Sequence, residues 1–120
     1  MRRMKSYDEF LKKSPLMKEI DMLYGDKINS LWIFEDTDSI YLDQIIIKPQ
    51  FRNEGLGSDI MSMLVKHADR EGKMVGVTPV DEFGSNLGRL KKFYKSFGFK
   101  PNSGRNRNFK YRDTFLREPK

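Results

Sequence analysis

Apolar positions recur with two different periods along the 120-residue chain, and the period predicts where helices and strands lie. Spacings of three and four between apolar residues are typical of amphipathic helices. They occur over residues 15–24, from Leu56 up to Gly72, and over residues 86–97. A shorter helix is predicted after Ser6, because Ser6 and Glu9 have the spacing of a capping box.

Runs rich in β-branched and aromatic residues predict strands between these helices. Residues 28–34 and 40–48 are two such runs, and the acidic stretch 35–38 between them favours a turn, so they predict an antiparallel hairpin. Residues 73–78 predict a short strand after the central helix. A strand, a helix and a further strand joined by tight turns favour parallel pairing through a right-handed crossover.

The C-terminal part is expected to add two strands. Phe99 begins a brief one, a turn follows at residues 102–104, and residues 107–116 alternate as a last strand. The element order then predicts an α/β fold, with a mixed β-sheet covered by helices on both faces. The chain length predicts a single domain over residues 1–120.

A glycine-rich turn lies between the second strand and the central helix, with the sequence R-N-E-G-L-G from Arg52 to Gly57. The first N–H groups of a helix lack backbone partners and carry partial positive charge, so an anion is stabilised there. Gly55 and Gly57 allow the backbone to approach a ligand closely, and Arg52 adds a full charge. By itself the hexapeptide is equally compatible with an ordinary connection.

The composition limits which partners and which kinds of site are expected. The 23 basic and 17 acidic residues give a net charge of +6, which favours an anionic partner such as a phosphorylated cofactor, a nucleic acid or an acidic protein. The chain has no cysteine and one histidine, His67, so no metal site is expected. No stretch is long and apolar enough to span a bilayer or to act as a signal peptide, and a cytoplasmic protein is expected.

Two motifs together resemble the GNAT superfamily of N-acetyltransferases. Residues 50–57, Q-F-R-N-E-G-L-G, are similar to the family's Q/R-x-x-G-x-G/A turn, and residues 90–99, L-K-K-F-Y-K-S-F-G-F, to its F/L-Y-x-x-x-G-F motif. The resemblance covers roughly residues 40–99. It implies a GNAT-like mixed sheet with splayed parallel strands at the cofactor site. The short region before Tyr41 implies a trimmed N-terminal part.

The resemblance implies that acetyl-coenzyme A is the co-substrate. Its pyrophosphate is expected at the glycine turn, and its pantetheine arm along the preceding strand, opposed by residues 75–78. An asparagine that orients the cofactor in the family corresponds to Asn86, one place earlier than usual. The expected cofactor-binding residues are Ile45, Ile46, Ile47, Arg52, Asn53, Glu54, Gly55, Leu56, Gly57, Ser58 and Asn86.

The same resemblance implies direct acetyl transfer to a primary amine, either a protein lysine or a small amine. Tyr94, the tyrosine of the second motif, is expected to protonate the departing thiolate, and a backbone N–H of the strand before the turn to stabilise the oxyanion. Asp43 on that strand is the preferred base, ahead of the loop carboxylates Asp81 and Glu82. The amine could also arrive already neutral.

The sequence is also compatible with two other functions. Basic residues interleaved with Phe109 and Tyr111 near the C-terminus are compatible with a nucleic-acid-binding module. A degenerate acetyltransferase fold that only binds a partner is a further alternative. The acceptor is expected to be an acidic protein, a nucleic-acid-linked amine or a small molecule, and a homodimer is possible. The basic residues interleaved with Phe109 and Tyr111 are Lys100, Arg105, Arg107, Lys110 and Arg112.

Overall fold

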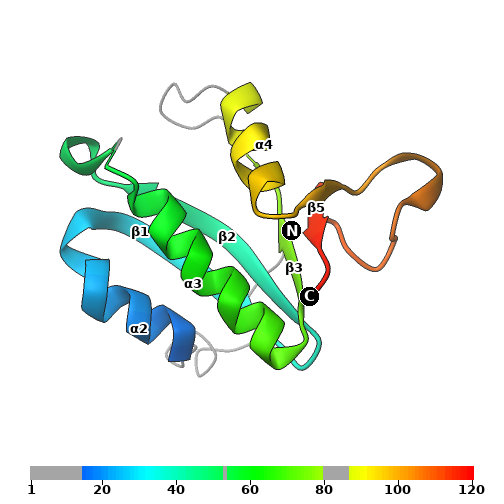
Figure 1. Cartoon of the computed structure of the whole chain (residues 1–120), viewed down its shortest axis with the longest axis horizontal. Coiled ribbons are helices and arrows are strands. Elements are labelled where there is room, and N and C mark those ends of the chain that lie inside the picture. The colour runs from blue at the N-terminus through cyan, green and yellow to red at the C-terminus, as the bar shows by residue number, and fades with distance from the viewer. Residues whose placement is uncertain (1–14, 53, 80–86) are drawn as a thin grey trace.

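A computed structural model describes residues 15–52, 54–79 and 87–120 of the chain (Figure 1). The helix predicted after Ser6 lies outside these ranges. The helices are α2 (Pro15–Tyr24), α3 (Leu56–Glu71) and α4 (Leu87–Ser96), and the strands are β1 (Ile28–Glu35), β2 (Ser39–Ile47), β3 (Met74–Val77), β4 (Lys100–Pro101) and β5 (Phe115–Arg117). None of the helices in the described ranges combines the length and apolar character needed to cross a membrane.

The five strands form one mixed sheet in the order β1-β2-β3-β5-β4. β1 and β2 make the predicted antiparallel hairpin, and the Asp36 side chain closes its turn by accepting hydrogen bonds from the N–H groups of Asp38 and Ser39 at 2.9 and 2.7 Å. β2 and β3 are parallel, with α3 as the crossover between them. The predicted α/β class with a mixed sheet is therefore confirmed.

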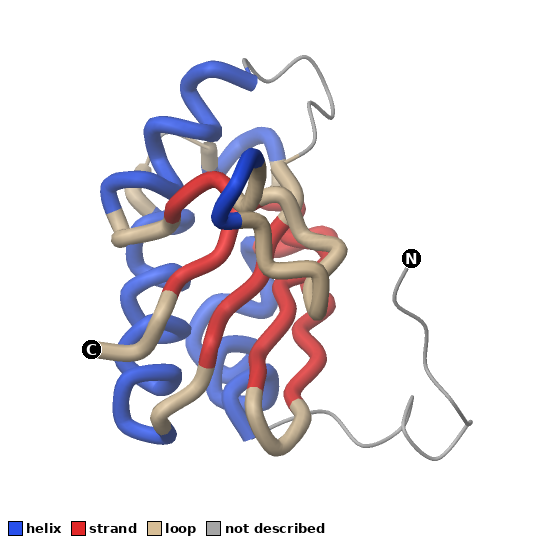
Figure 2. Tube along the Cα trace, turned by 90° about the vertical axis from the view of Figure 1, so that its right-hand side faces the viewer, coloured by secondary structure: helices blue, strands red, loops and turns tan. Residues whose placement is uncertain are grey.

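α2 and α3 pack side by side on one face of the sheet, where the core lies (Figures 1 and 2). Ile20 of α2, Ile60 and Leu64 of α3, Ile40 of β2 and Val75 of β3 are all fully buried there. Each such side chain stabilises the fold by about 1.5–3 kcal/mol through the apolar surface that it removes from water. The apolar helical periodicity in the sequence thus corresponds to real packing against the sheet.

The end of the segment 102–114 lies against the opposite face at β2 and β3, through Tyr111 and Asp113. The Tyr111 hydroxyl forms a buried 2.6 Å hydrogen bond with Ser39, and the Tyr111 ring lies 6.1 Å from that of Tyr41. Asp113 packs directly on Gly76, where an added Cβ would lie 2.3 Å from the carboxylate. Glycine is therefore required at position 76 for this segment to approach the sheet.

The strand predicted over residues 107–116 is wrong for most of its length, since β5 contains only Phe115–Arg117. The side chain of Asn102 explains the difference. Its amide donates to the carbonyls of Asn108, Tyr111 and Asp113, and its oxygen accepts the N–H of Asn108 at 2.7 Å. These bonds hold the segment as a loop, because the carbonyls that a ladder would use already have a partner.

An ion pair between buried Arg117 and partly buried Asp69 fastens the C-terminal segment to α3. The Arg117 guanidinium donates to both carboxylate oxygens of Asp69, at 2.7 and 3.0 Å, and its Nε donates to the Phe97 carbonyl. The N–H of Lys120 also donates to Asp69. Hydrogen bonds from Arg117, together with that of Lys120 and the charge of Arg117, outweigh desolvation and lower the pKa of Asp69 to about 2.

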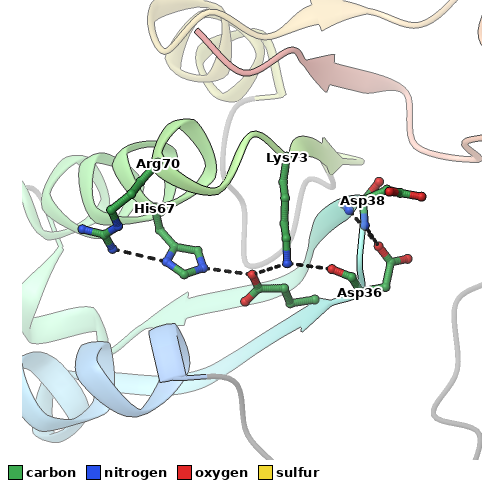
Figure 3. A network of polar contacts seen from close by, with 7 residues as sticks. Asp36, Asp38, His67, Arg70 and Lys73 are labelled. Atoms are coloured by element: carbon green, nitrogen blue, oxygen red, sulfur yellow. Dashed lines mark hydrogen bonds and ion pairs between the residues drawn. The ribbon is translucent and has the colours of Figure 1, made fainter.

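A second polar network joins the hairpin turn to the end of α3 (Figure 3). The Glu35 carboxylate accepts from Lys73 Nζ at 2.7 Å and lies 2.9 Å from Nε2 of His67. Lys73 also donates to the Asp36 carbonyl. Burial, which raises the pKa of Glu35, is outweighed by the hydrogen bonds of Lys73 and His67, so this pKa lies below its usual value. His67 thus has a structural partner.

The Asp69 pKa makes stability depend on pH. Because the folded-state pKa is lowered from 3.8 to about 2, the carboxylate contributes stability that is present above pH 4 and lost as the pH falls towards 2. The difference corresponds to about 2 kcal/mol. Urea unfolding of the wild type and of Asp69→Asn should show this extra pH-dependent loss in the wild type alone. Equal pH slopes in both proteins would contradict the assignment.

Candidate active site

A β-bulge in β2 shapes the site. Trp32 of β1 pairs with Gln44 of β2, whereas the next residue, Ile33, pairs with Leu42. Asp43 is therefore an extra residue in β2, and no residue of β1 is in register with it. Bulges of this kind bend a strand and redirect its side chains, and they are common beside functional sites.

Beyond the bulge the parallel strands separate. β3 pairs with β2 only over residues 39–42, ending at Leu42 and Val77, while β2 itself continues to Ile47. The sequence predicted that residues 75–78 oppose Ile45, Ile46 and Ile47, and this prediction is wrong. The β3 residues 75–77 pair instead with residues 40–42 of β2. The expected splay is present, and it begins at the bulge.

The bulge also changes which side chains face the helices. Leu42 faces the core before it, and Ile45, paired with buried Leu31, packs against the core after it. Before the bulge the even-numbered residues Ile40 and Leu42 face the helices. After it the odd-numbered residues Ile45 and Ile47 do so. A side chain of Ile47 lies 3.8 Å from where a Cβ on Gly57 would be.

A cleft of about 500 Å³ opens where the two strands separate, between the start of α3 and the inner face of α4. Its size is that of a typical small-molecule or cofactor site. The residues that line it are Leu42, Asp43, Gln44, Ile45, Ile46, Ile47, Arg52, Gly55, Gly57, Ser58, Met61, Val77, Thr78, Pro79, Arg89, Leu90, Phe93 and Tyr94.

The start of α3 forms one wall of this cleft. Gly55 has φ +80°, a left-handed conformation that favours glycine, and the first helical bond runs from the Asp59 N–H to the Gly55 carbonyl. Gly55 makes no side-chain cap, so the N–H groups before Asp59 are available for an anion. A Cβ on Gly57 would lie 3.6 Å from the Phe93 ring. This backbone and charge arrangement fits a pyrophosphate group.

Two arginines bring positive charge to the cleft. Arg52 follows the turn at the end of β2 and donates from Nε to the Ile47 carbonyl at 3.1 Å. Arg89 reaches the cleft from the first turn of α4. The positive charge favours an anionic ligand in the cleft.

The other wall carries Tyr94, whose side chain is 6 % exposed. Phe93 and Phe99 contact its ring edge-on, at centroid distances of 5.4 and 5.6 Å. Burial raises the pKa of Tyr94 to about 12. The phenol is protonated at neutral pH, as a proton donor must be, and its raised pKa makes it a weaker acid than an exposed tyrosine.

The structure brings together most of the residues expected from the sequence. Asp43, Ile45 to Ile47, Arg52, Gly55, Gly57, Ser58 and Tyr94 all line the cleft. Glu54 is exposed, and the side chain of Leu56 is buried in the protein, so neither side chain is part of the lining. The other expected site residues, Asn53, Asn86, Asp81 and Glu82, lie outside the described residues.

Sequence reasoning missed Gln44, Met61, Arg89 and the role of Phe93. Arg89 and Phe93 are four residues apart on α4, as are Leu90 and Tyr94, so helical spacing from the tyrosine could have found them. Gln44 faces the cleft because of the bulge, which no local pattern in β2 announces.

A family model described as an acetyltransferase (GNAT) domain matches residues 19–101, more than two thirds of the chain. The chain belongs to the GNAT acetyltransferase family. This GNAT protein is accordingly an acyltransferase, with acetyl-coenzyme A as its co-substrate. No curated protein matches it significantly.

Several solved structures are similar to this GNAT protein. One is Ard1 from Thermoplasma volcanium, with 15% identity, a TM-score of 0.46, and coverage of 90% of this chain and 80% of the other. A GNAT family acetyltransferase from Elizabethkingia anophelis with acetyl-CoA bound has 16% identity, TM-score 0.46 and coverage of 97% and 92%. The AtaT Y144F mutant toxin bound to the C-terminus of the antitoxin AtaR has 19% identity, TM-score 0.41 and coverage of 72% and 52%.

The raised pKa of Tyr94 is testable by absorbance titration of tyrosinate. Since Tyr94 ionises only near pH 12, Tyr94→Phe should leave the titration curve unchanged up to pH 11. Circular dichroism at each pH would verify that both proteins remain folded. If the substitution removed one tyrosine from the transition near pH 10, the burial argument would be wrong.

Proposed function

We propose that this protein transfers the acetyl group of acetyl-coenzyme A directly to a primary amine in the cleft between β2 and β3. The observation that carries the proposal is the convergence of three features on one cleft. They are the uncapped start of α3, the strand edge exposed beyond the bulge, and the protonated Tyr94. Each supplies a different requirement of acetyl transfer.

The start of α3 is assigned to the pyrophosphate. N–H groups from residues 55–58 and the positive end of a 16-residue helix stabilise phosphate oxygens. Arg52 and Arg89 add positive charge to the lining of the same cleft. The hydrogen bond from Arg52 to the Ile47 carbonyl fixes the arginine against the strand that leads into the turn.

The pantetheine arm is assigned to β2 beyond the bulge. Because β3 does not pair with Ile45, Ile46 and Ile47, the backbone on that side of β2 is open to an extended ligand that pairs as a strand would. A backbone N–H of the same stretch is the proposed oxyanion donor. It is held rigidly by the hairpin with β1, which is the condition for efficient electrostatic stabilisation.

The reaction forms an amide bond and breaks the thioester. The neutral amine nitrogen attacks the acetyl carbon, the C–S bond breaks, and the Tyr94 hydroxyl gives its proton to the departing sulfur. Asp43 is the proposed acceptor of the proton that the amine loses. The bulge supports this role, since it places an exposed carboxylate at the cleft next to the point where the strands part.

Gly57→Glu tests the cofactor site. Its side chain would project between Phe93 and Ile47 and place a negative charge at the proposed pyrophosphate position. The wild-type Tm should rise by roughly 10 °C with acetyl-coenzyme A at a hundredfold excess over Kd, and the variant should lose this rise.

Gly57→Ala is the matched control, because its Cβ meets Phe93 and Ile47 only at ordinary contact distances and should preserve the rise. A glutamate in the first turn of a helix is favourable, so the unliganded Gly57→Glu protein should remain folded. A wild-type rise in Tm for Gly57→Glu would contradict the assigned site.

Tyr94→Phe tests the proton donor. The variant should keep the rise in Tm with acetyl-coenzyme A but lower kcat by about 10²-fold, since a general acid contributes at least that factor. Thiol release with a panel of mono- and polyamines measures kcat. Tyr24→Phe, at the end of α2, is the control and should turn over normally. Normal kcat in Tyr94→Phe would remove Tyr94 from the mechanism.

A further inference from the structure

Positive charge is concentrated in one part of the chain. Residues 87–112 contain nine basic residues and no acidic one, although the net charge of the whole chain is +6. The rest of the chain is therefore net negative. Such an asymmetry indicates a local surface for a polyanion.

Part of this charge lies on a loop away from the cleft lining. The basic loop, residues 102–112, follows β4 and projects from the sheet edge (Figure 1). Arg105, Arg107, Lys110 and Arg112 are all exposed on it. Its Phe109 side chain is 83 % exposed, and the Arg107 guanidinium carbon lies 5.1 Å from the centre of that ring. The guanidinium is attracted to the face of the ring, and the rest of the ring is accessible to a binding partner.

The basic loop is held in shape before any partner binds. The four hydrogen bonds of the Asn102 side chain close it, and the Tyr111 ring is anchored on the sheet through Ser39. A preformed surface loses little conformational entropy on binding. The loop therefore presents its ring and its cations together.

The basic loop also returns to the sheet beside the cleft. The N–H of Thr114, two residues after the loop, donates to Thr78 Oγ at 3.2 Å, and Thr78 lines the cleft. The family match ends at residue 101, so the loop is additional to the region that the family model describes. A molecule bound along the loop would extend towards the site of acetyl transfer.

We propose that the basic loop binds a single-stranded nucleic acid. An exposed Phe109 with a guanidinium on its face provides a stacking platform for a base, and the neighbouring arginines and lysine contact the phosphates. An acidic peptide would be attracted by the charges, but its carboxylates would not stack on the exposed ring. Combined with the proposed acetyl transfer, on which this last step rests, the acceptor amine belongs to a nucleic-acid-linked molecule.

Fluorescence anisotropy with a labelled twelve-nucleotide uridylate strand tests the binding, using the full chain at 50 mM to 200 mM salt. Affinity should fall steeply with salt. Arg105→Gln with Arg112→Gln should weaken binding and reduce the slope of log K against log salt by about 1.4, because each lost phosphate contact on a single strand contributes about 0.7. Phe109→Ala should weaken binding about tenfold and leave that slope unchanged.

Matched controls remove the same groups elsewhere. Lys18→Gln with Lys66→Gln removes two exposed charges, and Met22→Ala removes a side chain that is 87 % exposed; both should bind as the wild type does. Wild-type affinity in Phe109→Ala, or equal loss in the lysine control, would overturn the proposal. So would competition by a twelve-residue glutamate peptide that matches competition by unlabelled uridylate.

The Tm measured with acetyl-coenzyme A separates this proposal from the proposed function. The loop variants should keep the cofactor-induced rise while losing the nucleic acid. If the wild type bound the strand but showed no rise in Tm, acetyl transfer would fail and the loop assignment would stand on the anisotropy data.

Discussion

The extra residue at Asp43 is the constraint on which the site depends. A bulge bends a strand and increases its twist, and the bulge at Asp43 shifts the register of β2 against β1. From the same point β3 no longer follows β2. If β3 continued to pair with β2, it would cover the edge of β2 at Ile45 to Ile47. The cleft of about 500 Å³ between the two strands would then be absent.

The rest of the fold holds this opening in place. α3 packs on the separated strands with its fully buried residues, and its first turn forms the cleft wall. At its other end, the Asp69–Arg117 pair fixes the C-terminal strand, and Glu35 with Lys73 and His67 fixes the hairpin turn. Polar contacts thus anchor α3 at the end far from the cleft, while glycine and backbone N–H groups occupy the end that faces a ligand.

Local patterns predicted what depends on local physics. α2 was predicted with its observed bounds, and α3 from its first residue to the Gly72 that ends it, because apolar periodicity and glycine positions are properties of adjacent residues. The glycine turn and Tyr94 were found through motif resemblance, and both line the cleft. The bulge, the 102–114 loop and the Asp69–Arg117 pair depend on partners far apart in the chain: Asn102 replaces a ladder that residues 107–114 would otherwise favour. No pattern within those segments carries that information.

A crystal structure of this protein with coenzyme A bound would show whether the cofactor occupies the cleft between β2 and β3. We expect the pyrophosphate at the N–H groups of residues 55–58 and the pantetheine arm paired with β2 beyond Asp43. The sulfur should lie within hydrogen-bond reach, roughly 3 Å, of the Tyr94 hydroxyl. Coenzyme A bound outside the cleft between β2 and β3, or a sulfur remote from Tyr94, would contradict this assignment.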